Sequence, residues 1–160
     1  CILLLNAGHE ATVHALGNAV KAILQTGTDV AATDPAALAD EALRFDPPLH
    51  MFTRWCYEPA QIAGHAFAPG DTVALLLGSA TRDPALRDAP DRFDPARATA
   101  AHTAFGGGLH FCVGAPLARL EMQVALPALF ARCPALRLAE TPRYADLYHF
   151  RGLERLMVRA

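Results

Sequence analysis

The first part of the chain carries apolar residues at the spacing of an α-helix. Between Cys1 and about Gln25 they recur every three or four positions, and this stretch contains no proline. Gly8 interrupts the pattern, at a position where glycine costs helix propensity and often has a packing or functional reason. The segment Thr26–Asp29 ends the pattern. We therefore predict one long helix over residues 1–25.

A second helix is predicted directly afterwards. Asp34 is a favoured N-cap residue, and Pro35 is tolerated at the first helical position because no backbone N–H is needed there. The helix should run to about Phe45, since the pair Pro47–Pro48 cannot continue it.

Beyond these prolines the pattern changes to short strands. We predict strands at Arg54–Tyr57 and Gln61–Ile62, and a third at Thr72–Leu77 after a Pro69–Gly70 turn. Residues 82–104 are rich in Asp, Pro and Arg, and this composition predicts an irregular connection.

The last third of the chain opens with a glycine-rich loop, Phe105–Gly114. An amphipathic helix is predicted next, over about Ala115–Arg132, and a strand at Arg155–Val158 near the end. The whole pattern predicts a fold that is mainly α-helical with small β-sheets.

Composition narrows the class of protein. The chain has 160 residues, enough for one domain or part of one. Apolar residues make up 52% and charged residues 19%, which excludes a disordered chain. The net charge is −2 and the basic residues form no run, so we expect no nucleic-acid partner.

Compartment is indicated by what the sequence lacks. No apolar run is long enough to cross a bilayer, and no secretory signal is visible, so we expect no membrane partner. The four cysteines are far apart and form no C-x-x-C pair, which predicts a reduced, cytoplasmic setting without a structural zinc site. Because Cys1 already stands inside an apolar helical pattern and no Met precedes it, we expect that part of a longer protein has been removed.

The glycine-rich loop is the strongest candidate for chemistry. Three consecutive glycines, Gly106–Gly108, let a backbone approach a large flat group or adopt positive φ. Cys112 lies just before a predicted helix N-terminus, where the free N–H groups favour a thiolate. Such a thiolate can be a nucleophile, a redox centre or a metal ligand, and a buried inert thiol is the alternative.

The segment resembles the haem-binding loop of the cytochrome P-450 family of haem-thiolate monooxygenases, whose pattern is F-G-x-G-x-H-x-C-x-G. All six specified positions match: Phe105, Gly106, Gly108, His110, Cys112 and Gly114. The resemblance implies haem b as cofactor, Cys112 as the axial thiolate on iron, and His110 facing a haem propionate. A thiolate ligand donates electron density that favours O–O cleavage.

A second element of the resemblance is the E-x-x-R spacing of Glu41 and Arg44. This spacing places both side chains on one helical face, although a solvated surface pair is the alternative for the motif taken alone. A second copy, Glu140 and Arg143, encloses a proline and is a poor helix candidate. In the family's order of landmarks, the resemblance implies that Glu41, Arg44 and Arg97 form a buried charge network that supports the haem loop.

Two further positions are implied by the same resemblance. Arg54 follows the double proline and would reach a haem propionate, because a guanidinium suits a carboxylate, and a surface arginine is the alternative. The first helix resembles the oxygen-activation helix, A-G-x-[DE]-T, in which Gly8 would leave room for dioxygen and Glu10 would assist proton delivery.

The helix departs from this pattern at one position. Ala11 stands where the family has threonine, and Thr12 lies about 100° further around the helix, so its hydroxyl cannot take over that role. Three interpretations stay open: a substrate hydroxyl or water substitutes, the chemistry is atypical, or oxygen use is poorly coupled to product.

The resemblance covers only the C-terminal part of the family fold. It implies that residues 1–160 are the C-terminal part of one domain of a soluble, bacterial-type haem-thiolate monooxygenase, with the N-terminal part absent. The expected partners are a ferredoxin- or flavin-type electron donor, O2 and an apolar small-molecule substrate. The alternative is a non-catalytic truncated fragment that holds little or no haem and forms homo-oligomers through its exposed apolar face. A third alternative is a thiol enzyme that uses Cys112 with a histidine base.

Overall fold

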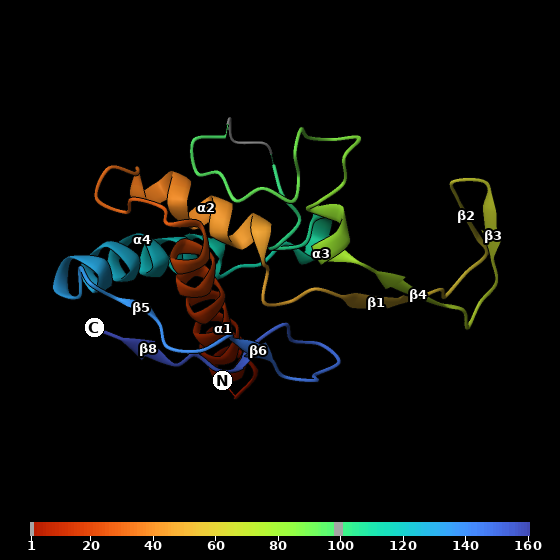
Figure 1. Ribbon diagram of the computed structural model, residues 1–160. Helices are drawn as coiled ribbons and strands as arrows, with labels where there is room; N and C mark the ends of the chain where they lie inside the picture. The colour runs from red at the N-terminus through yellow and green to blue at the C-terminus, as the bar shows by residue number, and fades with distance from the viewer. Residues whose placement is uncertain (1, 98–100) are drawn as a thin grey trace.

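The computed structural model describes residues 2–97 and 101–160, so Cys1 lies outside the described part of the chain. The helices are α1 (Ile2–Thr26), α2 (Pro35–Phe45), α3 (Leu77–Ala80) and α4 (Ala115–Arg132), with a 3-10 turn η1 (Gly108–His110). The strands are β1 (Phe52–Trp55), β2 (Ala60–Ile62), β3 (His65–Phe67), β4 (Thr72–Leu75), β5 (Arg137–Leu138), β6 (Arg143–Tyr144), β7 (Leu153–Arg155) and β8 (Val158–Arg159). The predicted class, mainly α with small sheets, is confirmed (Figure 1).

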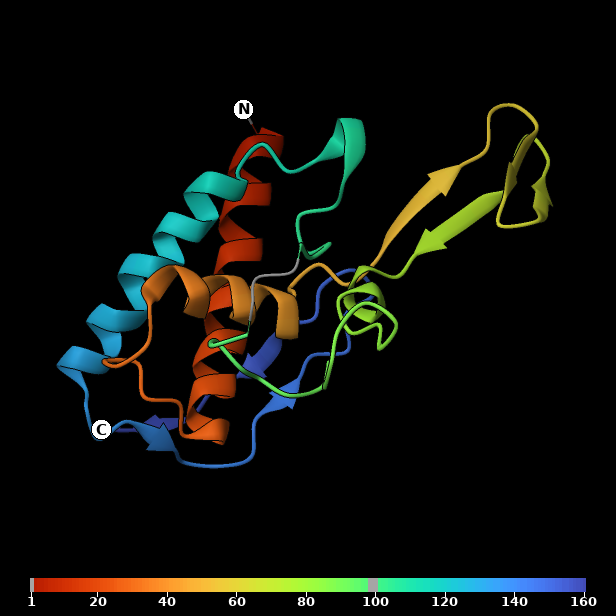
Figure 2. The same ribbon diagram turned by 90° about the horizontal axis from the view of Figure 1, so that it is seen from above.

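The core forms where α1, α2 and α4 pack against one another (Figure 2). Its largest fully buried apolar side chains come from all three helices: Ile23, Leu38, Met122 and Leu126. Each such side chain contributes about 1.5–3 kcal/mol by leaving water. Alanines such as Ala19 and Ala39 are buried between them and let the helix backbones approach closely.

Only the second half of α1 takes part in this core. Residues 4–10 are all exposed, whereas Ala19, Ala22 and Ile23 are almost fully buried. The exposed N-terminal half of the helix therefore reaches past α2 and lies beside the start of α4 (Figure 2).

Both predicted helix boundaries follow from local chemistry. The Asp34 carboxylate accepts a hydrogen bond from the backbone N–H of Ala37 at 2.8 Å, which caps α2 as expected. Gly27 adopts φ +66° after α1, and the N–H of Thr28 then bonds the carbonyl of Ile23 at 3.2 Å. The predicted ends of both helices are confirmed to within a residue or two.

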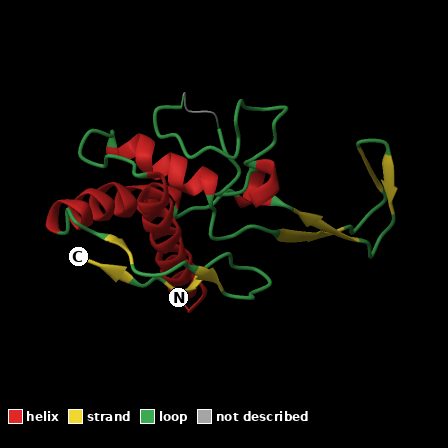
Figure 3. Ribbon diagram, in the orientation of Figure 1, coloured by secondary structure: helices red, strands yellow, loops and turns green. Residues whose placement is uncertain are grey.

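The strands form two-stranded antiparallel ladders, β1–β4, β2–β3, β5–β8 and β6–β7. The first two extend away from the helical body, as the colouring by secondary structure makes plain (Figure 3). The predicted strand Thr72–Leu77 is wrong at its end, because the chain turns into α3 at Leu77. The strand predicted from Arg54 begins earlier, at Phe52, because β1 pairs along its whole length with β4.

The single strand predicted at Arg155–Val158 is also wrong, because two ladders divide it. Leu153–Arg155 pairs with β6, and Val158–Arg159 pairs with β5. The chain therefore passes from one ladder to the other between the two strands, which a local pattern of apolar residues cannot reveal.

The expectation of an amphipathic α4 needs correction. Met122 and Leu126 face the core, but Leu117, Leu120 and Val124 are exposed. Apolar residues therefore lie on more than one face of the helix, and the second apolar face is uncovered in this chain.

The connection over residues 82–104 has neither helix nor strand in its described part, as predicted. Arginines anchor it by donating to backbone carbonyls. Arg82 donates to Phe45 at 3.0 Å, and Arg97 donates to Ala89 and Arg92 at 3.0 Å each. These bonds give a fixed path to a segment without ladder hydrogen bonds.

Candidate active site

The cysteine loop is held by backbone hydrogen bonds of its own. These run from Gly106 N–H to Thr103 O (2.8 Å), Phe111 N–H to Gly108 O (3.1 Å), Cys112 N–H to Phe105 O (3.0 Å) and Ala115 N–H to Cys112 O (3.2 Å). The bond between Cys112 and Phe105 closes the loop across its base, so the two residues are fixed relative to each other.

Two glycines in the loop are required by backbone conformation. Gly106 has φ +71° and Gly108 has φ +66°, a region in which a side chain costs about 1–3 kcal/mol. Gly107 between them is extended at φ −166°, so its conformation suits any residue. Both conformationally required glycines are among the three that the sequence pattern specifies, and the third, Gly114, has φ −83°.

Cys112 presents a free thiol at the end of this loop. Its residue is exposed, and it forms no disulfide. It lies two residues before Gly114, the N-cap of α4, so the positive end of the helix dipole lies close to the thiol. Gly114 supplies no side-chain hydrogen bond to the free N–H groups there. The Cβ that Gly114 lacks would lie 3.7 Å from the Cys112 sulfur, an ordinary van der Waals contact.

Around the thiol the loop exposes apolar side chains. Leu109, Phe111 and Val113 face solvent, and His110 between them is also exposed. The guanidinium of Arg54, on the exposed strand β1, donates to its neighbour's carbonyl, Thr53 O, at 2.9 Å. The structure does not bring Arg54 into contact with the cysteine loop or with His110 in this chain.

Gly8 and Glu10, the two residues that match the oxygen-activation pattern, lie on the exposed half of α1. A Cβ on Gly8 would meet nothing within 4 Å, so the helix surface there is open. The Glu10 carboxylate lies 3.9 Å from His14 Nε2, one turn along the helix. Thr12 faces α4: its hydroxyl donates to the Gly8 carbonyl at 2.8 Å and lies 3.2 Å from Glu121 Oε2.

Glu41 and Arg44 form a bidentate ion pair. Arg44 Nε lies 2.7 Å from Glu41 Oε2, and Arg44 Nη2 lies 2.8 Å from Oε1. Both residues are almost fully buried, at 5% and 2% exposed. The second copy of the spacing makes no such pair, because Glu140 bonds Arg155 and Arg143 lies near Glu154.

The irregular connection completes this buried pair. Arg97 Nε lies 3.7 Å from Glu41 Oε1, and the Asp94 N–H donates to the same oxygen at 2.7 Å. Arg44 in turn donates to the carbonyls of Pro90 at 2.8 Å and Arg92 at 3.1 Å. The structure thus brings Glu41, Arg44 and Arg97 together, and ties α2 to the connection.

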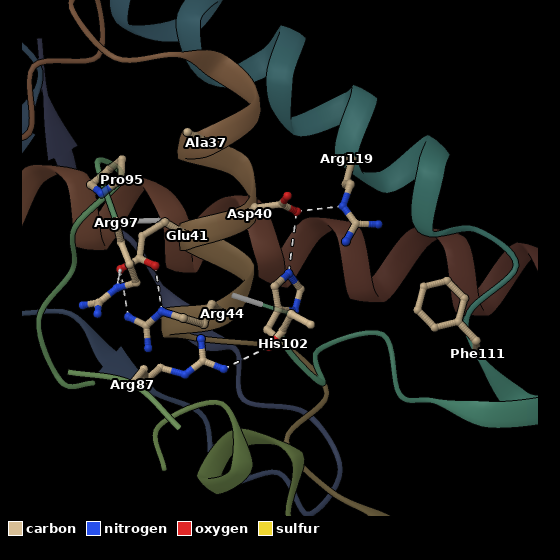
Figure 4. A pocket seen from close by; sticks show the side chains of 11 residues that line it. Ala37, Asp40, Glu41, Arg44, Arg87, Pro95, Arg97, His102, Phe111 and Arg119 are labelled. Carbon is tan, nitrogen blue, oxygen red and sulfur yellow. Dashed lines mark hydrogen bonds and ion pairs between the residues drawn. The ribbon is translucent and has the colours of Figure 1, made fainter. Parts of the chain in front are cut away.

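A neighbouring ion cluster was not found by sequence reasoning (Figure 4). One oxygen of Asp40 lies 2.7 Å from Arg119 Nε and 3.6 Å from His102 Nε2. Burial lowers the pKa of His102, and the charges of Arg119 and Arg87 lower it further against the opposing effect of Asp40. The three residues come from separate parts of the chain, and no short motif joins them.

Asp40, His102 and Arg119 line a cavity of about 240 Å³ between α2, the irregular connection and α4 (Figure 4). Its wall includes Arg97 and Phe111, so it reaches from the buried charge network to the cysteine loop. The cavity therefore connects two features that sequence analysis treated separately.

A second charged network, also missed, joins α1 to the C-terminal segment. The buried Asp46 carboxylate lies 3.0 Å from Lys21 Nζ and 2.7 Å from Arg151 Nε, and it accepts a hydrogen bond from the Tyr144 hydroxyl. Burial and the nearby Asp46 charge raise the pKa of Tyr144. Asn18 adds bonds to the Asp46 and Arg151 carbonyls at 3.1 and 2.7 Å.

Two kinds of feature are missing from the part of the chain that the structure describes. No helix there combines the length and the apolar character needed to span a bilayer. No group of three His, Cys, Asp or Glu side chains within residues 2–97 and 101–160 is placed to hold a metal ion.

Comparison with known proteins gives a consistent family. Residues 36–140 match the family model for cytochrome P450. The chain is 42% identical to the biotin biosynthesis cytochrome P450 of Bacillus subtilis over 99% of its length, and 40% identical to the 6-deoxyerythronolide B hydroxylase of Saccharopolyspora erythraea over 99%. It spans 42% and 41% of those two proteins.

Solved structures agree with the sequence comparison. The crystal structure of P450BioI in complex with hexadec-9Z-enoic acid ligated acyl carrier protein matches with a TM-score of 0.93 at 41% identity. That match covers 99% of this chain and 43% of the other. The ligand-free monooxygenase TamI matches with a TM-score of 0.92 at 38% identity, over 99% of this chain and 41% of the other.

Proposed function

Because the chain belongs to the cytochrome P450 family, we propose that residues 1–160 are the C-terminal part of one haem-thiolate monooxygenase domain. The whole protein would insert one atom of O2 into an apolar organic substrate. The observation that carries this proposal is Cys112, a free and exposed thiol at the end of a loop that matches the family's haem pattern at every specified position.

The residues present fit a haem. A single thiolate suffices as protein ligand, and Cys112 is not committed to a disulfide. Gly107 and Gly108 leave open space where a side chain would stand, since a Cβ on either would meet nothing within 4 Å. The exposed apolar side chains Leu109 and Val113 suit contact with a flat apolar ring. In this proposal Cys112 holds the iron, and the cofactor is haem b.

When bound, the haem supplies the activation of oxygen, and the chain supplies ligation, orientation and proton handling. His110 and Arg54 are proposed to face the propionates. His110 is exposed, and the Arg54 guanidinium donates only to the Thr53 carbonyl among the described residues, so both are available for an anionic group.

On α1 we propose that Gly8 leaves room for dioxygen and that Glu10 assists proton delivery. Gly8 presents open helix surface, and the Glu10 carboxylate is about half exposed with His14 nearby, so it can exchange a proton with solvent. Thr12 cannot substitute for the missing threonine, because its hydroxyl is engaged toward α4. Of the three interpretations of Ala11, we propose the first, in which water or a hydroxyl of the substrate supplies the second proton.

Electrons would come from a ferredoxin- or flavin-type donor, and a cytoplasmic location is part of the same proposal. The relatives support an electron-accepting haem enzyme in general, since they include monooxygenases and hydroxylases. Cysteines Cys56, Cys112 and Cys133, which form no disulfide, suit a reducing compartment.

The decisive experiment is the absorption spectrum of the reduced, CO-bound full-length protein. Thiolate ligation by Cys112 predicts a strongly red-shifted Soret band, which Cys112→Ser should abolish. Cys133→Ser is the matched control, because Cys133 is a free, half-buried thiol that caps α4 at its other end. A wild-type band without the red shift, or one retained in Cys112→Ser, would overturn the proposal.

A second candidate concerns the 160-residue chain taken by itself. Its large exposed apolar side chains, among them Ile2, Leu5 and Leu120, favour a non-catalytic fragment that holds little or no haem and associates with itself. The haem content of the purified 160-residue chain distinguishes a working remnant of the haem site from this non-catalytic fragment. Stoichiometric haem that depends on Cys112 supports a working remnant of the site, and haem-free oligomers support the second candidate.

A further inference from the structure

The cluster of Asp40, His102 and Arg119 lies beside the cysteine loop and has no role in the proposed reaction. We propose that these three residues act as a clamp that positions the loop: Asp40 fixes Arg119 against the ring of Phe105, and Phe105 in turn holds the backbone of Cys112. The inference rests on the proposed function, because the loop is taken to be the haem-ligand loop.

The first contact of the clamp joins two helices. Asp40 stands on α2 and Arg119 on α4, and their 2.7 Å contact uses the Nε–H edge of the guanidinium. Both side chains are about one third exposed, so this pair by itself adds little to stability. Its consequence is geometric, since a guanidinium held at one edge has a fixed plane.

The second contact carries this orientation to the loop. The Arg119 guanidinium carbon lies 4.7 Å from the centre of the Phe105 ring, the distance of a cation–π contact. The Phe105 ring also lies 6.3 Å from that of Phe111 and packs against the buried core. A planar cation can bond a carboxylate at its edge and cover a ring with its face, and a flexible ammonium cannot do both in the same way.

The third contact reaches the candidate ligand. The carbonyl of Phe105 accepts the Cys112 N–H at 3.0 Å, so a shift of Phe105 moves the backbone that carries the thiol. Only one hydrogen bond and one aromatic contact therefore separate the Asp40–Arg119 pair from Cys112.

His102 holds the opposite side of Asp40. Its Nδ1 accepts the N–H of Ala104 at 3.2 Å, which leaves the proton of a neutral ring on Nε2. Nε2 lies 3.6 Å from the Asp40 oxygen and has no hydrogen-bond partner among the described residues. The His102 side chain is 6% exposed, and its ring centre lies 6.0 Å from that of Phe105. Asp40, Arg119 and Arg87 are the charged groups that act on this imidazole, and burial keeps it neutral.

The test uses full-length protein with two variants of the clamp. Asp40→Asn keeps the shape of the side chain and removes its charge, and Arg119→Lys keeps the charge and removes the planar group. Hydrogen exchange at the Cys112 amide should become about threefold to tenfold faster in both variants, in the lower part of the range typical of a lost coupling between contacting residues. Glu140→Gln is the matched control, because Glu140 forms an ion pair of similar length, 2.9 Å, with Arg155 in the C-terminal segment.

A second readout concerns the haem. The reduction potential should shift in the same two variants and not in Glu140→Gln, and the double variant should change exchange no more than the larger single change, because both residues act through one contact chain. If exchange at Cys112 is unchanged in both variants, the clamp is overturned. If Asp40→Asn fails to fold, Arg119→Lys alone decides.

The outcome also separates this inference from the proposed function. A red-shifted CO spectrum with unchanged exchange in the variants would leave the monooxygenase proposal standing and remove the clamp. Faster exchange in the variants, together with a wild-type spectrum that lacks the red shift, would retain the clamp and remove the haem assignment.

Discussion

At the scale of single residues, Glu41 is the carboxylate that holds the buried charge network of α2 and the irregular connection together. It pairs with Arg44 and Arg97 and accepts the Asp94 N–H, all from a position that is 5% exposed. Such a group is costly to remove, because the cations around it have already lost their water.

We expect Glu41→Gln to lower the free energy of unfolding by about 3–5 kcal/mol, because it leaves the Arg44 charge buried without a counter-ion. Urea unfolding of the full-length protein measures this directly. Glu140→Gln breaks an exposed ion pair and should change stability by less than about 1 kcal/mol. Equal effects of the two substitutions would mean that the backbone carbonyls around Arg44 suffice to hold its charge.

His102 gives a prediction about acid stability. Its pKa is lowered from the ordinary 6.5 by burial, so the unfolded chain binds a proton at this position more readily than the folded chain does. The stabilisation is therefore present above pH 6.5 and is lost as the pH falls through the lowered pKa. Unfolding free energies measured from pH 7.5 downward should fall less steeply in His102→Asn than in the wild type.

The control for this pH effect is His149→Asn, since His149 is exposed in the C-terminal segment. Its pH profile should run parallel to that of the wild type. A His102→Asn profile that also runs parallel would show that the imidazole does not couple to folding.

At the scale of elements, α1 and the C-terminal segment meet so closely that one position admits only glycine. A Cβ on Gly152 would overlap His14 Nδ1 and lie 2.5 Å from its Cγ. The base of the imidazole blocks the space, so a small movement of the ring tip cannot relieve the clash.

We expect Gly152→Ala to lower stability by about 1–3 kcal/mol, the usual cost of overpacking. His14→Ala in the same molecule should recover most of that loss. Gly17→Ala is the control, because a Cβ there meets only Leu153 at 3.9 Å and alanine favours the helix by about 1 kcal/mol. Thermal unfolding of the wild type and the three variants measures these changes. A double variant that is no more stable than Gly152→Ala would contradict the steric explanation.

The same elements show what the sequence could and could not predict. The start of α2 was predictable to the residue, because Asp34 and Pro35 act on neighbouring backbone groups. The tail strands and the ends of β1 and β4 were not, since pairing with a distant partner decides where a short strand stops. The alternation of residues along one segment carries no record of that partner.

The charged contacts also divide into those between residues close in the sequence, which the sequence could predict, and those between distant residues, which it could not. Glu41 and Arg44 are three residues apart, so a motif can register them. Arg119 and Asp40 are separated by 79 positions, and Arg151 and Asp46 by 105, so only the folded chain brings them together. The candidate ligand loop was predictable because its glycines and its cysteine lie within ten consecutive residues.

At the scale of the whole molecule, two apolar helix faces stay uncovered by the described residues of the 160-residue chain. One is the N-terminal half of α1, with Ile2, Leu4 and Leu5 at 71–79% exposed. The other is the outer face of α4, with Leu117, Leu120 and Val124 at 55–62%. The two helices touch where Thr12 approaches Glu121. The body is held together by the core and the Asp46 network and does not need these surfaces for its own packing.

We therefore expect the 160-residue chain to associate with itself in a concentration-dependent way, because contact between such surfaces removes apolar area from water at about 25 cal/mol per Å². Sedimentation velocity over a dilution series measures this. Leu4→Glu and Leu120→Glu should each shift the distribution toward monomer, whereas Leu86→Glu, an equally exposed leucine in the irregular connection, should not. In the full-length protein none of the three should alter the sedimentation coefficient if other parts of the protein cover these faces. If the 160-residue chain stays monomeric at high concentration, the two apolar helix faces remain stable in contact with water. That result would remove the support for a self-associating fragment.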